Sequence, residues 1–438
     1  MRGSSEALRA RIAIALIALI GFAFTLWVFY PGITTFDAWY VYQDMAKHQF
    51  GDWQSPAMLA LWMLIDPIAP GTGSLLLLTV ALYWLSFALI ASVIACRSPR
   101  LALLLPLLGF SPPAFVLLGV IWRDVLFGIA WLLAAGSVYA VAHKHASLRI
   151  PVQLAAIAVF AFGFLLRPNA LAAAPVLAAY LIWPAQFRWK RAVLLYVPAA
   201  LALFALVQVV YYGVFKAERQ HPLHSIMVFD LGGISHFAGQ NVFPGQWTPE
   251  QTKLIVSGCY NPIAWDVYWT QEPCLFVMQR LEGEKLFGTP AVSNAWLRAV
   301  TAHPLAYLEH RTTVEWTFLT GKNLVLWSRD LEDPDKVLFA GNPRLMTLKA
   351  VNDALNETPL FRAGTWLLLN LAFCLIAWRR RDTPAGTFVL GACGSGAVYL
   401  LSFWMVGVST DLRYAYWAVL AALAGGIAAA QGRSKPKV

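Results

Sequence analysis

Long apolar runs recur along this chain and restrict its fold more than any other feature. Ten of them reach roughly 17–25 residues, the length that an α-helix needs to cross the hydrocarbon core of a bilayer. Hydrophobic residues make up 59% of the 438 residues and charged residues only 13%, against about 25% charged in soluble domains. Because a spanning backbone must satisfy its own hydrogen bonds, we predict an all-α polytopic membrane protein with about ten transmembrane helices. The expected spans lie near residues 12–30, 73–95, 101–121, 125–142, 150–166, 170–185, 192–214, 362–378, 385–408 and 414–430.

One further apolar segment, residues 55–70 (SPAMLALWMLIDPIAP), is short and ends in prolines. We interpret it as a re-entrant or interfacial helix, with a short true span as the alternative. Basic residues beside the span ends concentrate on the cytoplasmic side of membrane proteins. With ten spans and a cytoplasmic N-terminus, the inside carries a net charge of +14 and the outside −4, which together give the formal +10. An eleventh span would place the loops FRWKRA and WRRRD outside, against this rule.

This topology divides the chain into three parts and places both termini in the cytoplasm. Residues 1–214 form an N-terminal membrane domain with seven spans and a first outer loop at 31–55. Residues 215–361 form a small, mainly helical extracytoplasmic domain, and residues 362–438 form a C-terminal membrane domain with three spans. Within the extracytoplasmic block, residues 292–320 have apolar residues at helical spacing, and Pro304 is expected to begin a second helix. The positive net charge follows from this topology, so we expect no nucleic acid as a partner.

Two of the five cysteines, Cys259 and Cys274, lie in the extracytoplasmic block. Thiols tend to oxidise outside the cytoplasm, and a pair 15 positions apart can close a loop, so we predict a disulfide. A zinc site is disfavoured, because no other Cys or His lies nearby at ligand spacing.

Charged residues gather at the outer ends of the spans, whereas the span interiors contain none. This absence disfavours ion-coupled transport, because transporters usually keep ionisable residues at membrane depth. Carboxylates suit a general base or a metal ligand, and arginines suit phosphate. We therefore predict chemistry on an anionic lipid, although Asp44, Lys47 and Asp411 are equally explained as solvated loop charges. The four outer turns carry Asp37, Asp44 and Asp52; Arg123 and Asp124; Arg167 and Asn169; and Asp411 and Arg413.

The first outer loop, with Asp37 followed by GDWQSPAMLALW, resembles that of GT-C type membrane glycosyltransferases. In that superfamily an acidic residue and a (D/H)-x-(H/Q)-x-P motif precede a helix. WRDVLFG resembles the second acidic motif of the superfamily, and RPNAL and DLRYAYW resemble the arginine motifs of bacterial members. HPLAYLEHR and the stretch from Cys259 to Cys274 resemble the outer domain of bacterial members. Gln54 departs from the family pattern, because many members have His there.

The resemblance implies a bacterial inner-membrane enzyme that transfers sugar from a polyprenyl-phosphate carrier to a glycan or lipid acceptor outside the cytoplasm. It implies an inverting displacement with Asp37 as the base and Asp124 as a second acid. Arginines, or a divalent cation held by Asp37 and Asp124, would stabilise the leaving phosphate. Trp265 and Trp269, like Trp39 and Trp53, are candidates to stack on sugars, with interfacial anchoring as the alternative. The expected phosphate ligands are Arg123, Arg167 and Arg413, and further donor or acceptor contacts are expected from Asp52, Gln54, Asn169, Asp411, Trp39 and Trp53.

Two other functions fit the same sequence. An O-antigen-type polymerase or ligase would use arginines with a histidine base in the outer block, whereas a lipid-linked-glycan flippase or transporter would need no base at Asp37. The glycosyltransferase should lose transfer when an acid of the first loop is changed, whereas the polymerase or ligase should lose transfer when a histidine of the block is changed. The sequence specifies neither the sugar nor the acceptor. The histidines available for the polymerase are His221, His224, His236, His303 and His310.

Overall fold

The computed structural model describes residues 2–142, 146–270, 272–322, 324 and 343–431. Within these residues the regular elements are all helical, and β pairing is limited to three isolated bridges. Residues 325–342 of the predicted extracytoplasmic block lie outside the described residues. So do Lys144, Arg433, Lys435 and Lys437, which contribute to the predicted charge asymmetry.

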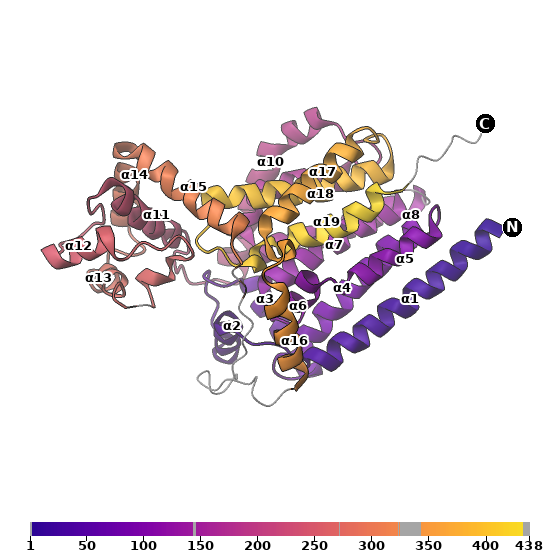
Figure 1. Ribbon diagram of the computed structural model, residues 1–438, viewed down its shortest axis with the longest axis horizontal. Coiled ribbons are helices and arrows are strands. Elements are labelled where there is room, and N and C mark those ends of the chain that lie inside the picture. Colours follow the sequence, from indigo (N-terminus) through magenta and orange to yellow (C-terminus); the bar gives the residue numbers. More distant parts are fainter. Residues whose placement is uncertain (1, 143–145, 271, 323, 325–342, 432–438) are drawn as a thin grey trace.

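Seven helices of the described chain are long and apolar enough to cross a membrane. They pack side by side as a bundle (Figure 1), which confirms the prediction of an all-α chain with several membrane-spanning helices. They are α1 (Arg2–Phe29), α4 (Gly73–Ile94), α7 (Arg123–Val141), α8 (Ala146–Leu166), α10 (Trp189–Val207) with its π-helical continuation η3 (Gln208–Val214), α18 (Pro384–Val406), and α19 (Tyr416–Ala429) with the preceding turn η7 (Leu412–Ala415).

The other three predicted spans are bent or short, so the expected count of ten is not confirmed. The run 101–121 forms α5 (Pro99–Leu108) and α6 (Pro112–Leu118), which meet at 53°; Pro112 lacks the N–H that would continue the first helix. The run 170–185 gives only η2 (Pro168–Ala172) and α9 (Ala174–Ile182), and the run 362–378 gives the 16-residue helix α17 (Ala363–Trp378).

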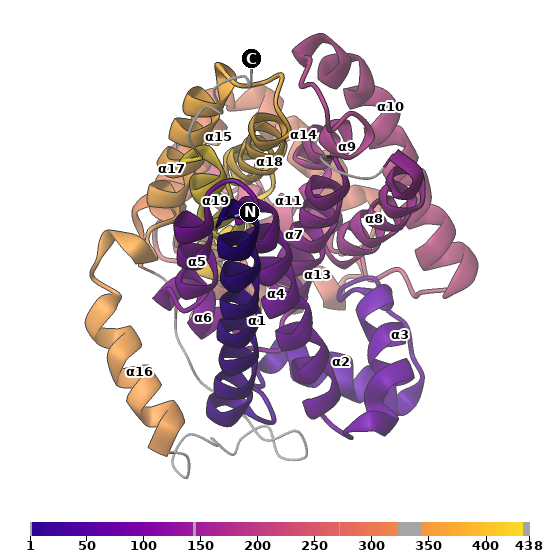
Figure 2. The same cartoon turned by 90° about the vertical axis from the view of Figure 1, so that its right-hand side faces the viewer.

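Residues 55–70 form α3 (Pro56–Ile65) and η1 (Asp66–Ile68). The Ser55 hydroxyl accepts a hydrogen bond from the Met58 amide at 3.3 Å and caps α3. Ten helical residues extend about 15 Å, half the thickness of the bilayer core, so this helix is too short to span. It lies beside α2 (Phe36–Lys47), as Figures 1 and 2 both show.

A separate helical domain lies at one end of the bundle (Figure 1). We call α11–α15, residues 223–320, the outer domain, because the predicted topology places it outside the cytoplasm. Pro304 begins its last helix, as expected from the sequence, and that helix extends onto α17 and α18. Its helices are α11 (Leu223–Ala238), α12 (Pro249–Ser257), η4 (Trp265–Tyr268), α13 (Phe276–Gly283), α14 (Pro290–Ala302) and α15 (Pro304–Thr320); α16 (Pro343–Leu355) and η6 (Pro359–Phe361) follow and pack on the bundle.

The N-terminal end of α1 and the C-terminal end of α19 lie at the end of the bundle remote from the outer domain (Figure 1). The charge asymmetry predicts that the outer domain faces away from the cytoplasm. A phosphatase reporter that is active only when exported should therefore be active when fused after Lys216 and inactive when fused after Ala429. An inactive fusion after Lys216 together with an active fusion after Ala429 would show that the orientation is wrong.

Cys259 and Cys274 form a disulfide and are 1% exposed, which confirms the predicted bond. A loop of this length is expected to stabilise its domain by about 3 kcal/mol. We therefore expect Cys259→Ala to lower the thermal unfolding midpoint of the purified protein, whereas Cys374→Ala, a change at a free cysteine, should change it less. Alkylation read by mass provides the direct check, and two freely reactive thiols without reductant would contradict the bond.

Candidate functional site

The chain segments before α2 and α7 are paired, which brings the first residues of the two helices together. The Ile33 amide donates to the Gly119 carbonyl at 2.8 Å, and the Ile121 amide donates back to the Ile33 carbonyl at 3.0 Å. The Trp122 indole N–H donates to the Thr35 hydroxyl at 2.7 Å. The first and second outer turns therefore form one structural unit.

Asp37, in the first turn of α2, meets side chains from two other parts of the chain. The Gln54 amide donates to Asp37 Oδ1 at 3.0 Å, and Arg413 Nη1 donates to Asp37 Oδ2. Burial alone would raise the pKa of Asp37, but the positive charges of Arg413 and Arg123 and these hydrogen bonds outweigh it, so the pKa is lowered. Asp37 is therefore a carboxylate at neutral pH, with 40% of its side chain exposed.

Asp124 and Arg167 form a buried ion pair between the second and third outer turns. Arg167 Nε lies 2.8 Å from Asp124 Oδ1, and the two side chains are 9% and 5% exposed. The Arg167 guanidinium also lies over the Tyr414 ring at 4.6 Å. Arg123, next to Asp124, instead donates to the Trp53 carbonyl at 3.0 Å, so its charge faces the first outer loop.

Arg413 brings the fourth outer turn into the same site. Asp411 caps η7 by accepting from the Arg413 amide at 2.9 Å. The Arg413 guanidinium lies over the rings of Trp122 at 4.7 Å and Tyr414 at 4.9 Å. Burial raises the pKa of Asp411 to about 6, although the charge of Arg413 opposes this. We call Asp37, Arg123, Asp124, Arg167 and Arg413 the charged site.

A small cavity of about 10 Å³, room for about one water molecule, opens on the charged site. Ligand pockets usually measure roughly 300–1,000 Å³, so a sugar and its phosphate require the surrounding loops to open. The cavity is lined by Asp37, Val41, Gln54, Met58, Ile121, Trp122, Arg123 and Asp124.

Asp52 lies in the same loop as Asp37 but has different partners. It accepts hydrogen bonds from the Tyr212 hydroxyl at 2.7 Å and from the Gln220 amide at 2.6 Å. Gln220 in turn accepts from the Trp53 amide at 2.9 Å. In this structure Asp52 fastens the first outer loop to η3 and to the chain that follows it, and it does not line the cavity.

Asn169 and Trp39 also lie outside the cavity lining. Asn169 Oδ1 and Trp39 Nε1 are buried and have no hydrogen-bond partner among the described residues. The Trp39 ring packs edge-on against Tyr40, with ring centroids 5.2 Å apart. Nothing in these contacts assigns either residue a direct role in the charged site.

The two predicted metal ligands, Asp37 and Asp124, do not fit a divalent cation. Each carboxylate is already paired with an arginine. The described residues contain no cluster of three or more His, Cys, Asp and Glu side chains suited to a metal. Because a hard cation such as Mg²⁺ requires several oxygen ligands, we derive no catalytic step from a metal.

The outer domain contributes an acid to this site that the sequence did not reveal. Asp266 interacts electrostatically with Arg413 and Asp37, and burial raises its pKa. It is positioned by backbone pairing, because the Trp265 amide donates to the Val408 carbonyl at 2.9 Å. In a block rich in charges, no pattern distinguishes Asp266 from its neighbours.

A second cluster, fully buried, joins the outer domain to the last outer turn. Arg311 Nε lies 2.7 Å from Asp230 Oδ1, and His310 Nε2 lies 3.3 Å from the same oxygen. Arg311 Nη1 donates to the Gly407 carbonyl at 2.7 Å. All three side chains are 0% exposed, so substrate cannot reach His310 as a base in this structure.

The other histidines considered for a polymerase make local contacts. His224 accepts from the Gly288 amide at 3.0 Å, and His236 lies 3.0 Å from the Val256 carbonyl. His303 lies 2.6 Å from Gln240. None of the histidines lines the cavity at the charged site.

Glu315, on α15, is 8% exposed and has no hydrogen-bond partner among the described residues. Burial raises its pKa to about 8. The folded protein therefore retains a proton that the unfolded chain loses above about pH 4.5, so stability should fall as pH rises from about 4.5 to 8.

We expect Glu315→Gln to remove this pH dependence and to stabilise the protein at pH 8 by up to a few kcal/mol, at about 1.4 kcal/mol per pKa unit. Glu309→Gln, an exposed change on the same helix, is the matched control. Unfolding midpoints measured across pH provide the check, and parallel curves for wild type and Glu315→Gln would contradict a buried neutral carboxyl.

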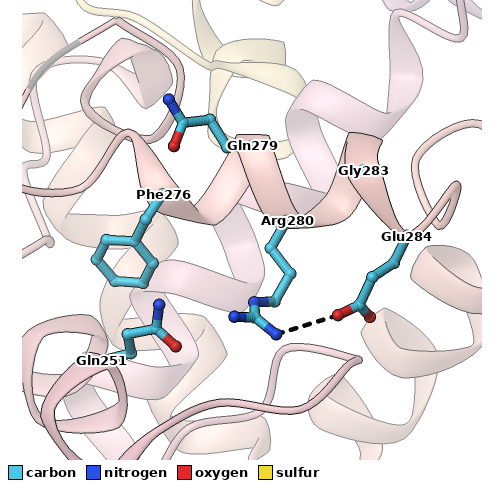
Figure 3. Close-up of a pocket in the computed structure, with 6 residues that line it drawn as sticks. All are labelled: Gln251, Phe276, Gln279, Arg280, Gly283 and Glu284. Carbon is cyan, nitrogen blue, oxygen red and sulfur yellow. Dashed lines mark hydrogen bonds and ion pairs between the residues drawn. The ribbon is translucent and has the colours of Figure 1, made fainter.

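The outer domain also has an open groove of about 350 Å³ between α12 and α13 (Figure 3). Its lining includes Arg280 and Glu284, a partly exposed ion pair of 3.1 Å within one helix. None of its lining residues belongs to the four outer turns, so it is separate from the charged site.

No family model matches this sequence, and no curated protein matches it. Among solved structures, it is similar to the oligosaccharyltransferase of Archaeoglobus fulgidus, determined with a tethered acceptor peptide that contains the NVT sequon. The sequences are 12% identical over 96% of this chain, and the TM-score is 0.38. The chain spans 49% of that protein. A likeness of this size assigns no activity, so function has to be argued from the geometry of the site.

Proposed function

We propose that the protein is a glycosyltransferase that moves a sugar from a polyprenyl-phosphate donor to a glycan or lipid acceptor at the outer face of a bacterial inner membrane. The observation that carries this proposal is the convergence of charges from four outer turns. Carboxylates and arginines from residues as far apart as 37 and 413 meet in direct contact. They do so at the end of an apolar bundle, where a lipid-linked anion is held by its tail in the membrane.

Arg413 and Arg123 are the better placed of the three arginines to bind the donor phosphate. Arg413 is 17% exposed and contacts Asp37, whereas Arg167 is held by Asp124 in a buried pair. Arginine binds phosphate through two parallel N–H donors. An incoming phosphate would compete with Asp37 for Arg413. Because Arg167 is held by Asp124, its role is to position the third outer turn.

The reaction is an inverting displacement at the anomeric carbon. Asp37 takes the proton of the acceptor hydroxyl as its oxygen bonds to that carbon, and the bond from the carbon to the phosphate oxygen breaks. The electron pair leaves with the polyprenyl phosphate, whose charge the arginines stabilise. When the phosphate draws Arg413 away from Asp37, the pKa of Asp37 rises, because the largest lowering influence is weakened. Donor binding therefore makes Asp37 a stronger base.

The test uses purified protein in liposomes with a radiolabelled polyprenyl-phosphate sugar and a soluble glycan acceptor. We expect labelled acceptor whose new glycosidic bond has the anomeric configuration opposite to that of the donor. Movement of the labelled lipid between leaflets without transfer would favour the flippase. Transfer that survives changes at Asp37 but is lost on changing an outer-block histidine would favour the polymerase or ligase.

A further inference from the structure

The loop closed by the Cys259–Cys274 disulfide lies directly against the charged site. Its residues 263 and 265 pair with the last outer turn, through the bond from the Trp265 amide to Val408 and a bond of 2.8 Å from the Thr410 amide to the Ile263 carbonyl. Tyr268 anchors the other side of the loop in the core of the outer domain, where it is 0% exposed. The loop is therefore held at both ends of η4.

Three tryptophan rings meet at this loop. Trp269 lies nearly parallel to Trp53 of the first outer loop, at 22° and 6.4 Å between centroids, and to Trp265, at 20° and 6.2 Å. Trp265 is 6% exposed, whereas Trp269 is 38% exposed. A buried ring and an exposed ring in one group resemble a binding platform more than a row of lipid anchors, which lie on the lipid-facing surface of spans.

The Asp266 carboxylate lies beside this platform and is free to bind a ligand. It has no side-chain hydrogen bond to any other described residue, although it is half-buried and within the electrostatic influence of Arg413 and Asp37. A carboxylate is a strong acceptor for hydroxyl donors. Its negative charge repels a phosphate, so it suits an uncharged polyol rather than the donor phosphate.

We infer that Trp53, Trp265, Trp269 and Asp266 form a subsite for a sugar ring of the acceptor. This inference rests on the proposed function, because it names the substrate that receives the transferred sugar. The apolar face of a pyranose covers the exposed Trp269 ring, and its hydroxyl edge donates hydrogen bonds to Asp266. Since residues 263–265 pair with the last outer turn, whose Arg413 contacts Asp37, a second hydroxyl of the same acceptor then lies near the base. The acceptor enters from the outer domain and the donor from the membrane.

The first experiment measures acceptor kinetics. Trp269→Ala is expected to raise the KM for a glycan acceptor by about tenfold, a loss typical of one aromatic contact, and to leave the KM for the donor unchanged. Asp266→Ala should act in the same direction, and Trp269→Phe should restore most of the affinity. Trp316→Ala, which removes a tryptophan that is 68% exposed on α15, is the matched control.

The second experiment measures sugar binding without donor, so that it does not depend on transfer. The probes are methyl glycosides of glucose, galactose, mannose and N-acetylglucosamine, and the readout is saturation-transfer difference NMR of the sugar protons, which does not depend on the tryptophan that is removed. We expect at least one probe to bind wild type and the Trp316→Ala variant but not Trp269→Ala. Binding that is lost in Trp269→Ala while no donor supports transfer would keep the subsite and reject the proposed function. Failure of every probe to bind wild type, or unchanged binding and acceptor KM in Trp269→Ala and Asp266→Ala, would overturn the subsite.

Discussion

Asp37→Asn is expected to lower the rate of sugar transfer by about 10²–10⁴-fold, the usual effect of removing a general base. Asparagine keeps the size of the side chain and can still contact Gln54, but its amide cannot take the proton of the acceptor. The KM for the donor should remain near the wild-type value or fall, because Arg413 no longer has a carboxylate competing with the phosphate. Initial rates in liposomes, with donor and acceptor varied separately, measure both effects.

Asp44→Asn is the matched control for this change. Asp44 lies two turns further along α2, is partly exposed and has no arginine among its charged neighbours. The Asp44→Asn variant should transfer sugar at a rate close to that of wild type. A well-folded Asp37→Asn protein with the wild-type rate would reject Asp37 as the base and would direct attention to the histidines of the outer domain.

Asp124→Asn is expected to lower the free energy of unfolding by about 3–5 kcal/mol, because it leaves the Arg167 charge buried without a partner. Transfer should fall with it, since the second and third outer turns lose their direct link. Thermal unfolding in detergent measures the loss of stability. Glu284→Gln breaks an ion pair whose side chains are 30% and 40% exposed, and should cost no more than about 1 kcal/mol.

The double variant Asp124→Leu/Arg167→Met separates stability from function. Replacing both members of a buried ion pair by apolar residues of similar size is often neutral or stabilising, so most of the lost stability should return. Transfer should stay low, because the site has lost a positive and a negative charge beside the reacting groups. A double variant with both wild-type stability and wild-type transfer would show that the pair only fills space.

The membrane helices can be predicted from sequence because apolar composition and length are local properties. The interruptions are harder to predict, because proline is tolerated inside membrane helices where neighbouring groups satisfy the freed carbonyls. Pro112 begins α6 and Pro175 is the second residue of α9, inside two runs that look continuous. Composition alone does not indicate which prolines interrupt a run.

The charged site can be predicted in part for a related reason. Asp124 and Arg413 are conspicuous in sequence because each lies in a short turn beside apolar helices, and Asp37 because it soon follows the first apolar run. Their pairing is not visible, because it depends on how turns distant in sequence meet in space. Asp266 and Glu315 escape notice, since polar residues are abundant around them and burial is set by the folded domain.

The backbone pairing between residues 263–265 and 408–410 makes the outer domain mechanically continuous with Arg413. If the domain swings outward while these bonds hold, it pulls the strand-like segment before η7 with it and draws the guanidinium away from Asp37. If the bonds break first, the domain moves while Arg413 stays in place. A crosslink between residues 264 and 409 would therefore make every outward movement of the outer domain draw the Arg413 guanidinium away from Asp37. Entry of a substrate and release of Asp37 from Arg413 would then occur together.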